Sequence, residues 1–218
     1  MRHLLQPRIL NRASIAALAT AVASYPRLSL WLNRSAPVWY LEAMIFLCSI
    51  VLWGFVFAWH THYTNRPVFI LKLEPEPFIA VTLIGIVAAM AFHLWLDPSL
   101  RSITPEEFPA DLNHWFALVL FALAFNQLFL LFAPFDWSMR LFHNRRVATG
   151  LTVLFGVIVL VIRNSTPIPP VLFATLLAGR IVTGFLAVAF YLRGGVILVW
   201  WWTFLFESRH LLNLTGNP

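Results

Sequence analysis

The stretch VWYLEAMIFLCSIVLWGFVFAW (residues 38–59) decides the fold of this chain. Its only charged side chain is Glu42, near the start. An α-helix rises about 1.5 Å per residue, so about 20 apolar residues cross the hydrocarbon core of a bilayer, which is roughly 30 Å thick. The stretch is therefore predicted to be a transmembrane helix.

Five further apolar stretches have a similar length and composition. The whole chain is 60% hydrophobic and 11% charged, with a mean hydropathy of +0.78, whereas about a quarter of the residues in a soluble domain are charged. The predicted fold is all-α: a polytopic bundle of about six transmembrane helices. The five stretches run from Phe78 to Leu96, Trp115 to Phe135, Val147 to Ile162, Val171 to Leu192, and Val196 to Leu212.

The chain divides into a short leading segment and a membrane domain. Residues 1–36 carry Arg2, Arg8 and Arg12 ahead of a run of small apolar residues, and they are predicted to be an amphipathic segment lying at the membrane interface. Residues 37–218 form the transmembrane helical domain. Short connections separate the last three helices, the final one at Gly194-Gly195, so these helices are expected to pack as antiparallel neighbours.

The net charge of +6 points to lipids rather than to nucleic acid. The arginines flank apolar runs instead of forming one basic face, and anionic headgroups attract cations in that position. We expect an integral protein of a bacterial inner (cytoplasmic) membrane, in contact with lipids and other integral membrane proteins. If the leading segment lies at the interface, its arginines join Arg27, Arg101, Arg163 and Arg209 on one side of the membrane. Those added arginines give that side the larger positive charge, so the amino terminus is predicted to be cytoplasmic.

Charged side chains inside the apolar stretches are candidates for function because they are costly in lipid. Arg180 falls near the middle of the fifth stretch. We expect it to form a structural ion pair with Asp136 or Glu207, and Glu42 remains an alternative partner. Glu107 has another predicted role, in a capping box with Thr104 before a short surface helix.

Three histidines invite a ligand interpretation. His60 and His62 follow the first span, and without a third ligand at a suitable spacing they are expected to lie at the interface without binding metal. His93 lies just inside the end of the second span. A histidine in that position can be an axial ligand of a haem or another tetrapyrrole pigment.

The order of features from residue 132 to residue 213 resembles the CPBP family, also called Abi, which includes CAAX prenyl endopeptidases and bacteriocin-processing intramembrane proteases. The segment APFDWSMR (residues 133–140) follows one span, and LFGVIV (residues 154–159) lies in the next. A span with Gly179 and Gly184 then ends at FYLRGG (residues 190–195).

The resemblance implies metal-free proteolysis in the membrane, in which a glutamate of a Glu-Glu-x-x-x-Arg motif activates water and two histidines assist. This chain departs from that pattern. With Arg140 at the family's arginine, Phe135 and Asp136 occupy the glutamate positions. Val159 replaces the first histidine, and the second falls near Thr203 or Phe204.

Three functions follow from these features. The leading hypothesis is a non-catalytic membrane subunit or assembly factor of a larger complex, built on a degenerate CPBP-like scaffold. The second is an active intramembrane protease with a shifted site, using Asp136, Arg140, Glu106, Glu107 and His143. The third is a pigment- or haem-associated subunit that uses His93.

Overall fold

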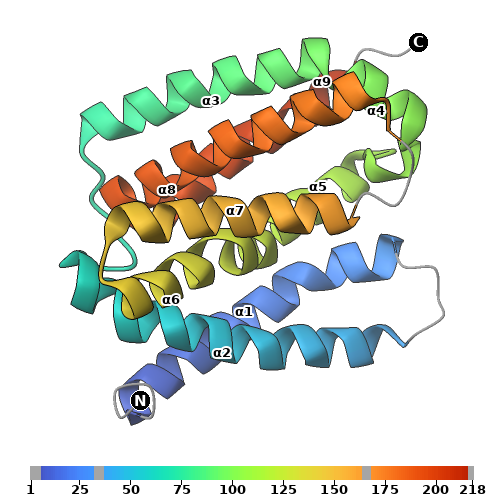
Figure 1. The fold of residues 1–218 in the computed structure, drawn as a ribbon. Helices are drawn as coiled ribbons and strands as arrows, with labels where there is room; N and C mark the ends of the chain where they lie inside the picture. Colours follow the sequence, from blue (N-terminus) through green and yellow to red (C-terminus); the bar gives the residue numbers. More distant parts are fainter. Residues whose placement is uncertain (1–5, 32–36, 164–167, 216–218) are drawn as a thin grey trace.

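The chain folds into a bundle of long helices. The computed structural model describes residues 6–31, 37–163 and 168–215, and no strand occurs among them (Figure 1). The elements are α1 (Pro7–Trp31), α2 (Val38–Thr64), α3 (Pro75–Trp95), α4 (Asp97–Ile103), the 3₁₀ turn η1 (Pro105–Glu107), α5 (Leu112–Phe121), the π-helical segments η2 (Ala122–Asn126) and η3 (Leu128–Phe132), α6 (Ala133–Phe142), α7 (Arg145–Arg163), α8 (Pro170–Glu207) and α9 (Arg209–Thr215).

Five helical bodies within these described ranges are long and apolar enough to cross a membrane, which is the pattern of an integral membrane protein. Large hydrophobic side chains cover their outer faces; Val87 is 68% exposed and Leu47 is 62% exposed. Such a surface suits lipid and is unfavourable in water. The five bodies are Val38–Thr64, Pro75–Trp95, Leu112–Phe142, Arg145–Arg163 and Pro170–Leu214.

The longest body, α8 with α9, reverses direction at Gly195. The backbone there has φ 64° and ψ −157°, a conformation that essentially only glycine adopts. The rings of Phe190 and Trp202 lie 5.3 Å apart, whereas a straight helix would separate them by about 18 Å. The two halves of α8 are therefore antiparallel neighbours, as predicted from Gly194-Gly195 (Figure 1). The expected count of about six is close, because five bodies include one that passes twice.

Helix α1 is helical as expected for the leading segment, and it lies lengthwise against α2 and α5 (Figure 1). Small residues form its inner face, including Ala13 and Ala17, which are fully buried. Thr20 accepts a hydrogen bond of 3.0 Å from Nε1 of Trp53 on α2. This packing places α1 along the bundle rather than across its end. Residues 1–5 and 32–36 of the predicted leading segment lie outside the described residues.

The third span is longer than predicted. It continues past Phe135 to Phe142, because η3 runs directly into α6. Pro134 stands at the start of α6 and does not end the helix. Two consecutive π-helical segments, η2 and η3, interrupt its α-helical geometry. Segments of this kind are rare and frequently occur at functional sites. Here they lie where Asn126 and Gln127 face a cavity.

The predicted capping box is wrong. Thr104 gives no side-chain cap to the short η1 turn, and its hydroxyl donates instead to the carbonyl of Leu100 at 3.2 Å. Glu107 instead forms an ion pair with Arg163, in which Oε1 of Glu107 lies 2.7 Å from Nη2 of Arg163. The cap of the following helix is Asp111, whose Oδ1 accepts the backbone N–H of His114 at 2.8 Å.

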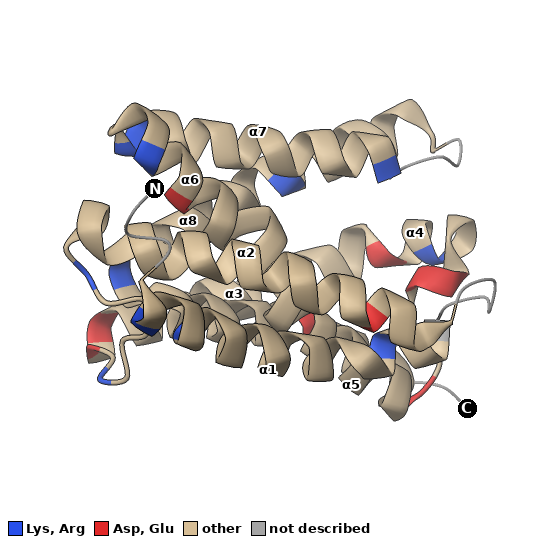
Figure 2. Ribbon diagram, turned by 90° about the horizontal axis from the view of Figure 1, so that it is seen from below, with Lys and Arg blue, Asp and Glu red and all other residues tan. Residues whose placement is uncertain are grey.

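The two ends of the bundle differ in charge (Figure 2). Because α1 runs along the bundle, its first arginines join the end where α7 begins, and Arg27 lies at the opposite end. The expectation that the arginines of the leading segment and Arg27 lie on the same side is therefore corrected. At the first end, which we call the basic end, two carboxylates, Glu74 and Glu76, accompany a larger set of described cations: Arg8, Arg12, Arg66, Lys72, Arg140, Arg145, Arg146 and Arg193. The opposite, acidic end carries Glu42, Asp97, Glu106, Glu107, Asp111 and Glu207 together with Arg27, Arg101, Arg163 and Arg209.

Candidate functional site

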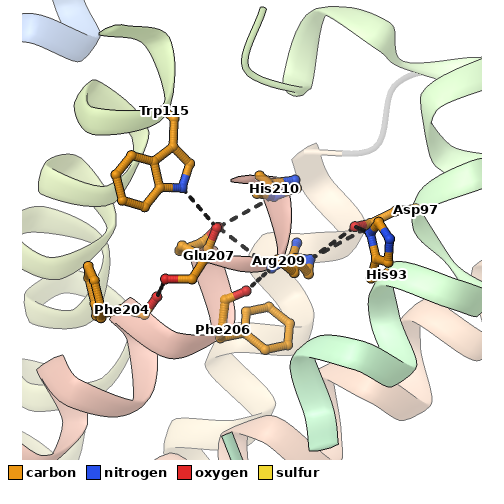
Figure 3. Close-up of polar contacts among 9 residues, drawn as sticks. His93, Asp97, Trp115, Phe204, Phe206, Glu207, Arg209 and His210 are labelled. Atoms are coloured by element: carbon orange, nitrogen blue, oxygen red, sulfur yellow. Dashed lines mark hydrogen bonds and ion pairs between the residues drawn. The ribbon is translucent and has the colours of Figure 1, made fainter. Parts of the chain in front are cut away.

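A cluster of charged side chains holds the acidic end together (Figure 3). Arg209, at the start of α9, lies 3.3 Å from Oδ2 of Asp97 and 3.6 Å from Oε2 of Glu207. His210 is 3.5 Å from the same Glu207 oxygen. Burial raises the pKa of Asp97 above its usual value of 3.8, and Arg209 opposes that rise.

The geometry of this cluster follows from the break between α8 and α9. Glu207 ends α8, and its backbone carbonyl accepts a hydrogen bond of 3.0 Å from Nε1 of Trp115 (Figure 3). The guanidinium of Arg209 lies 4.2 Å from the ring centre of Phe206. This cation–π contact and the carbonyl of Phe206, at 2.8 Å, fix the guanidinium between α8 and the start of α4.

A cavity of about 320 Å³ lies beside the cluster. Its wall includes Asn126 of η2 and charged side chains from α1, α4, η1, α7, α8 and α9. Arg163 and Glu107 form an ion pair of 2.7 Å at this wall. The charged lining residues are Arg27, Asp97, Glu107, Arg163, Glu207 and Arg209.

A second cavity of about 140 Å³ continues from the first into the bundle. Both are lined by Ala122, Asn126 and Glu207, so they share a wall. Arg180 of α8 lines the inner cavity, and its guanidinium lies against Gly156 of α7. A Cβ atom added at Gly156 would lie 2.5 Å from Nη2 of Arg180. Gln127, Thr152, Thr183 and Thr203 supply further polar lining.

The predicted ion pair of Arg180 does not form. Among the described residues, Arg180 makes no ion pair with Asp136, Glu207 or Glu42. Asp136 and Glu207 have other partners, and Glu42 lies on α2, whereas α8 packs chiefly on α3 and α7. Spacing along the chain could not reveal these distances between helices.

Asp136 belongs to a buried network elsewhere. Its Oδ1 lies 3.1 Å from Nδ1 of His60, and its Oδ2 accepts a hydrogen bond of 2.7 Å from the hydroxyl of Tyr191. The three side chains come from α6, α2 and α8. All three are enclosed, with exposed fractions of 0%, 1% and 0%. His60 is therefore enclosed by other helices instead of being exposed at the end of the first span.

The residues proposed for a shifted protease site are not brought together. Asp136 and His143 lie on α6 and just after it, towards the basic end, whereas Glu106 and Glu107 lie at the acidic end. A helix from Leu112 to Asp136 is about 36 Å long, so the two groups lie at opposite ends of the third span. Among the described residues, Asp136 and Arg140 form no ion pair. The ring of His143 packs edge-on against Tyr63 at 5.1 Å.

His93 has a neighbour that sequence reasoning did not foresee. Its Nδ1 lies 4.0 Å from Oδ2 of Asp97, one helical turn further along (Figure 3). Tetrapyrrole ligation by His93 stays a prediction. No group of three or more His, Cys, Asp or Glu side chains among the described residues could hold a metal ion.

Sequence reasoning also missed two lining residues of the inner cavity. Asn126 and Gln127 are adjacent amides within an otherwise apolar span, which is itself a usable signal because polar groups in lipid need partners. Arg209 was missed as the centre of the charged cluster, since it was assigned to the end of the last span.

Comparisons with known proteins identify no relative. No protein-family model, no curated protein and no solved structure matches the chain.

Proposed function

We propose that the protein is a non-catalytic integral membrane subunit or assembly factor of a larger membrane complex, built on a degenerate CPBP-like scaffold. The observation that carries the proposal is the separation of Asp136 from the polar cavity. A general base must reach its substrate and a water molecule. The carboxylate of Asp136 is fully buried and is held by His60 and Tyr191.

The described lining of the inner cavity does not combine a carboxylate with a histidine, the groups that the resemblance implies for proteolysis. Asn126 and Gln127 are amides, which do not act as bases at neutral pH. Glu207 is the acidic residue among those that line it, and its Oε2 lies within ion-pair distance of Arg209 and His210. No histidine lines this cavity among the described residues.

The outer surface favours a role in binding. Helix α2 exposes Trp39 and Leu47, and α3 exposes Val87 and Trp95, with exposed fractions from 62% to 78%. Lipid tails and the helices of other membrane proteins can both cover such residues, and helices associate in lipid through close packing and hydrogen bonds. Anionic lipid headgroups suit the basic end.

We place the protein in a bacterial inner (cytoplasmic) membrane, and the charge asymmetry then predicts its orientation. Short loops rich in Lys and Arg stay on the cytoplasmic side. The basic end, which carries the N-terminal arginines and the loop around residue 144, is then cytoplasmic, and the acidic end faces outward.

The test is gentle purification of the full chain from its native membrane, followed by sizing of the particle and identification of its components. We expect a particle larger than one chain with its lipid or detergent, containing defined partners in constant ratio. A monodisperse monomer without a partner would count against the proposal. Peptidase activity that is lost in Glu207→Gln, with Glu76→Gln at the start of α3 as the matched control, would replace it with a protease that uses Glu207 instead of the residues expected from the sequence.

A further inference from the structure

The inner cavity presents hydrogen-bond donors without partners. Arg180, Asn126 and Gln127 all line it, and none of the three side chains forms a hydrogen bond or ion pair with another described residue. The hydroxyls of Thr152 and Thr183 differ, because each donates to a carbonyl of its own helix. The available donors are therefore a guanidinium and two amides.

The position of Arg180 in the bundle makes an unpaired guanidinium costly. It lies ten residues after the start of α8, about 15 Å from the acidic end of the bundle. A charge at such a depth is found almost always with a partner or facing a water-filled space. No side chain in the described part of the chain supplies that partner, and the cavity is where a ligand would meet the guanidinium.

Gly156 leaves room for the guanidinium of Arg180. A side chain at this position would meet Nη2, Nε and Cζ of Arg180 at 2.5, 2.9 and 3.0 Å. The guanidinium therefore lies directly on the backbone of α7. It is fixed in place with its remaining surface towards the cavity. A fixed, planar guanidinium matches the paired oxygens of a carboxylate or a phosphate.

The outer cavity provides an approach for an anion. It shares Asn126 with the inner one and opens among Arg27, Arg163 and Arg209 at the acidic end. The three carboxylates in its wall have cationic partners: Glu107 contacts Arg163, and Asp97 and Glu207 both contact Arg209. Cations that line a low-dielectric cleft attract anions towards it.

We propose that Arg180, Asn126 and Gln127 form a binding site for the oxyanion of a small acidic ligand, reached from the acidic end. The shared chemistry is a carboxylate or phosphate group, either free in water or carried as the headgroup of an amphiphile. The site is distinct from the partner-binding surface proposed above and stands without it.

The test uses the full chain in nanodiscs of zwitterionic phosphatidylcholine. One arm titrates inorganic phosphate and acetate by calorimetry, and the other replaces part of the lipid with phosphatidic acid and measures protection against thermal unfolding. Arg180→Gln is expected to weaken binding about tenfold or more, because a charge-assisted hydrogen bond is lost. Binding of the free ions identifies a soluble ligand, and protection by phosphatidic acid alone identifies an amphiphile.

Matched variants keep the test decisive. Gly156→Ala displaces the guanidinium without removing its charge and is expected to weaken binding, whereas Gly150→Ala on the same helix has nothing within 4 Å of the added carbon and is expected to bind normally. Arg145→Gln, at the basic end, controls for nonspecific attraction. The proposal is overturned if neither arm shows binding, or if Arg180→Gln and Gly156→Ala bind as the unaltered chain does.

Discussion

Nδ1 of His60 lies 3.1 Å from Oδ1 of Asp136, and both side chains are closed off from the surroundings. The two residues are 76 positions apart in the chain. The hydroxyl of Tyr191 completes the network from α8. One carboxylate therefore fastens three helices, α2, α6 and α8, at a point where neither water nor lipid supplies a substitute partner.

Removing that carboxylate is expected to destabilise the protein strongly. Asp136→Ala leaves the His60 ring nitrogen and the Tyr191 hydroxyl buried without their hydrogen-bond partner, and breaking a buried pair costs about 3 to 5 kcal/mol. Tyr191→Phe removes one hydrogen bond and keeps the ring packing on Phe132, at 4.8 Å, so it should cost about 1 to 2 kcal/mol. Denaturant-induced unfolding in detergent measures both. Equal costs would show that the network is not held by Asp136.

The reversal at Gly195 is expected to tolerate no side chain. A Cβ atom there would lie 2.5 Å from the carbonyl oxygen of Val68, and that oxygen accepts the N–H of Val196 at 3.0 Å. Gly195→Ala combines this clash with an unfavourable φ, and we expect a loss of about 2 kcal/mol or more. Gly150→Ala should be neutral or slightly stabilising, because alanine is the better helix former. Thermal unfolding of the two variants side by side tests this, and similar midpoints would contradict it.

The apolar stretches could be predicted from sequence because each is a local property. The length and hydropathy of residues 38–59 and 145–163 suffice to place helices there. Gly194-Gly195 marked a reversal because two adjacent glycines weaken any helix and only glycine fits the backbone angles found. The fold class followed from these local signals.

The polar contacts could not be predicted in the same way, because they depend on which helices touch. The partner of Asp136 is on α2 and that of Asp97 is on α9, far along the chain in both cases. Helix α1 was misplaced for a related reason. Its alanines are too weakly hydrophobic to signal a long buried face, yet their small size is what allows α1 to approach α2 closely.

The orientation of the bundle can be tested with single cysteines in a Cys48→Ser background. Leu71→Cys places a thiol in the loop at the basic end, where Leu71 is 84% exposed, and Ser99→Cys places one on α4 at the acidic end. Because positively charged loops remain in the cytoplasm, a membrane-impermeant maleimide added to intact cells should label Ser99→Cys and spare Leu71→Cys. Both thiols should react after the membrane is opened. Labelling of Leu71→Cys alone would show that the basic end faces outward and would contradict the prediction.

Two aspartates outside the spans should show opposite pH dependence. Burial raises the pKa of Asp97 above 3.8, so the folded state holds that proton more tightly than the unfolded state does. The stability that Asp97 contributes is therefore full below pH 3.8 and is lost as the pH rises through the raised pKa. Hydrogen bonds from His114 lower the pKa of Asp111 below 3.8, so its contribution is present above pH 3.8 and is lost as the pH falls through the lowered pKa.

Asparagine substitutions separate these two contributions, because each removes the titration and keeps nearly the same shape. Thermal unfolding from acid to neutral pH gives the difference in stability between the unaltered chain and each variant. Relative to Asp97→Asn, the unaltered chain should lose stability as the pH rises. Relative to Asp111→Asn, which keeps a capping side chain, it should gain stability as the pH rises. If the stability difference changed with pH in the same direction in both comparisons, the two assignments would be contradicted. Burial would then not dominate the pKa of Asp97, or hydrogen bonding would not dominate the pKa of Asp111.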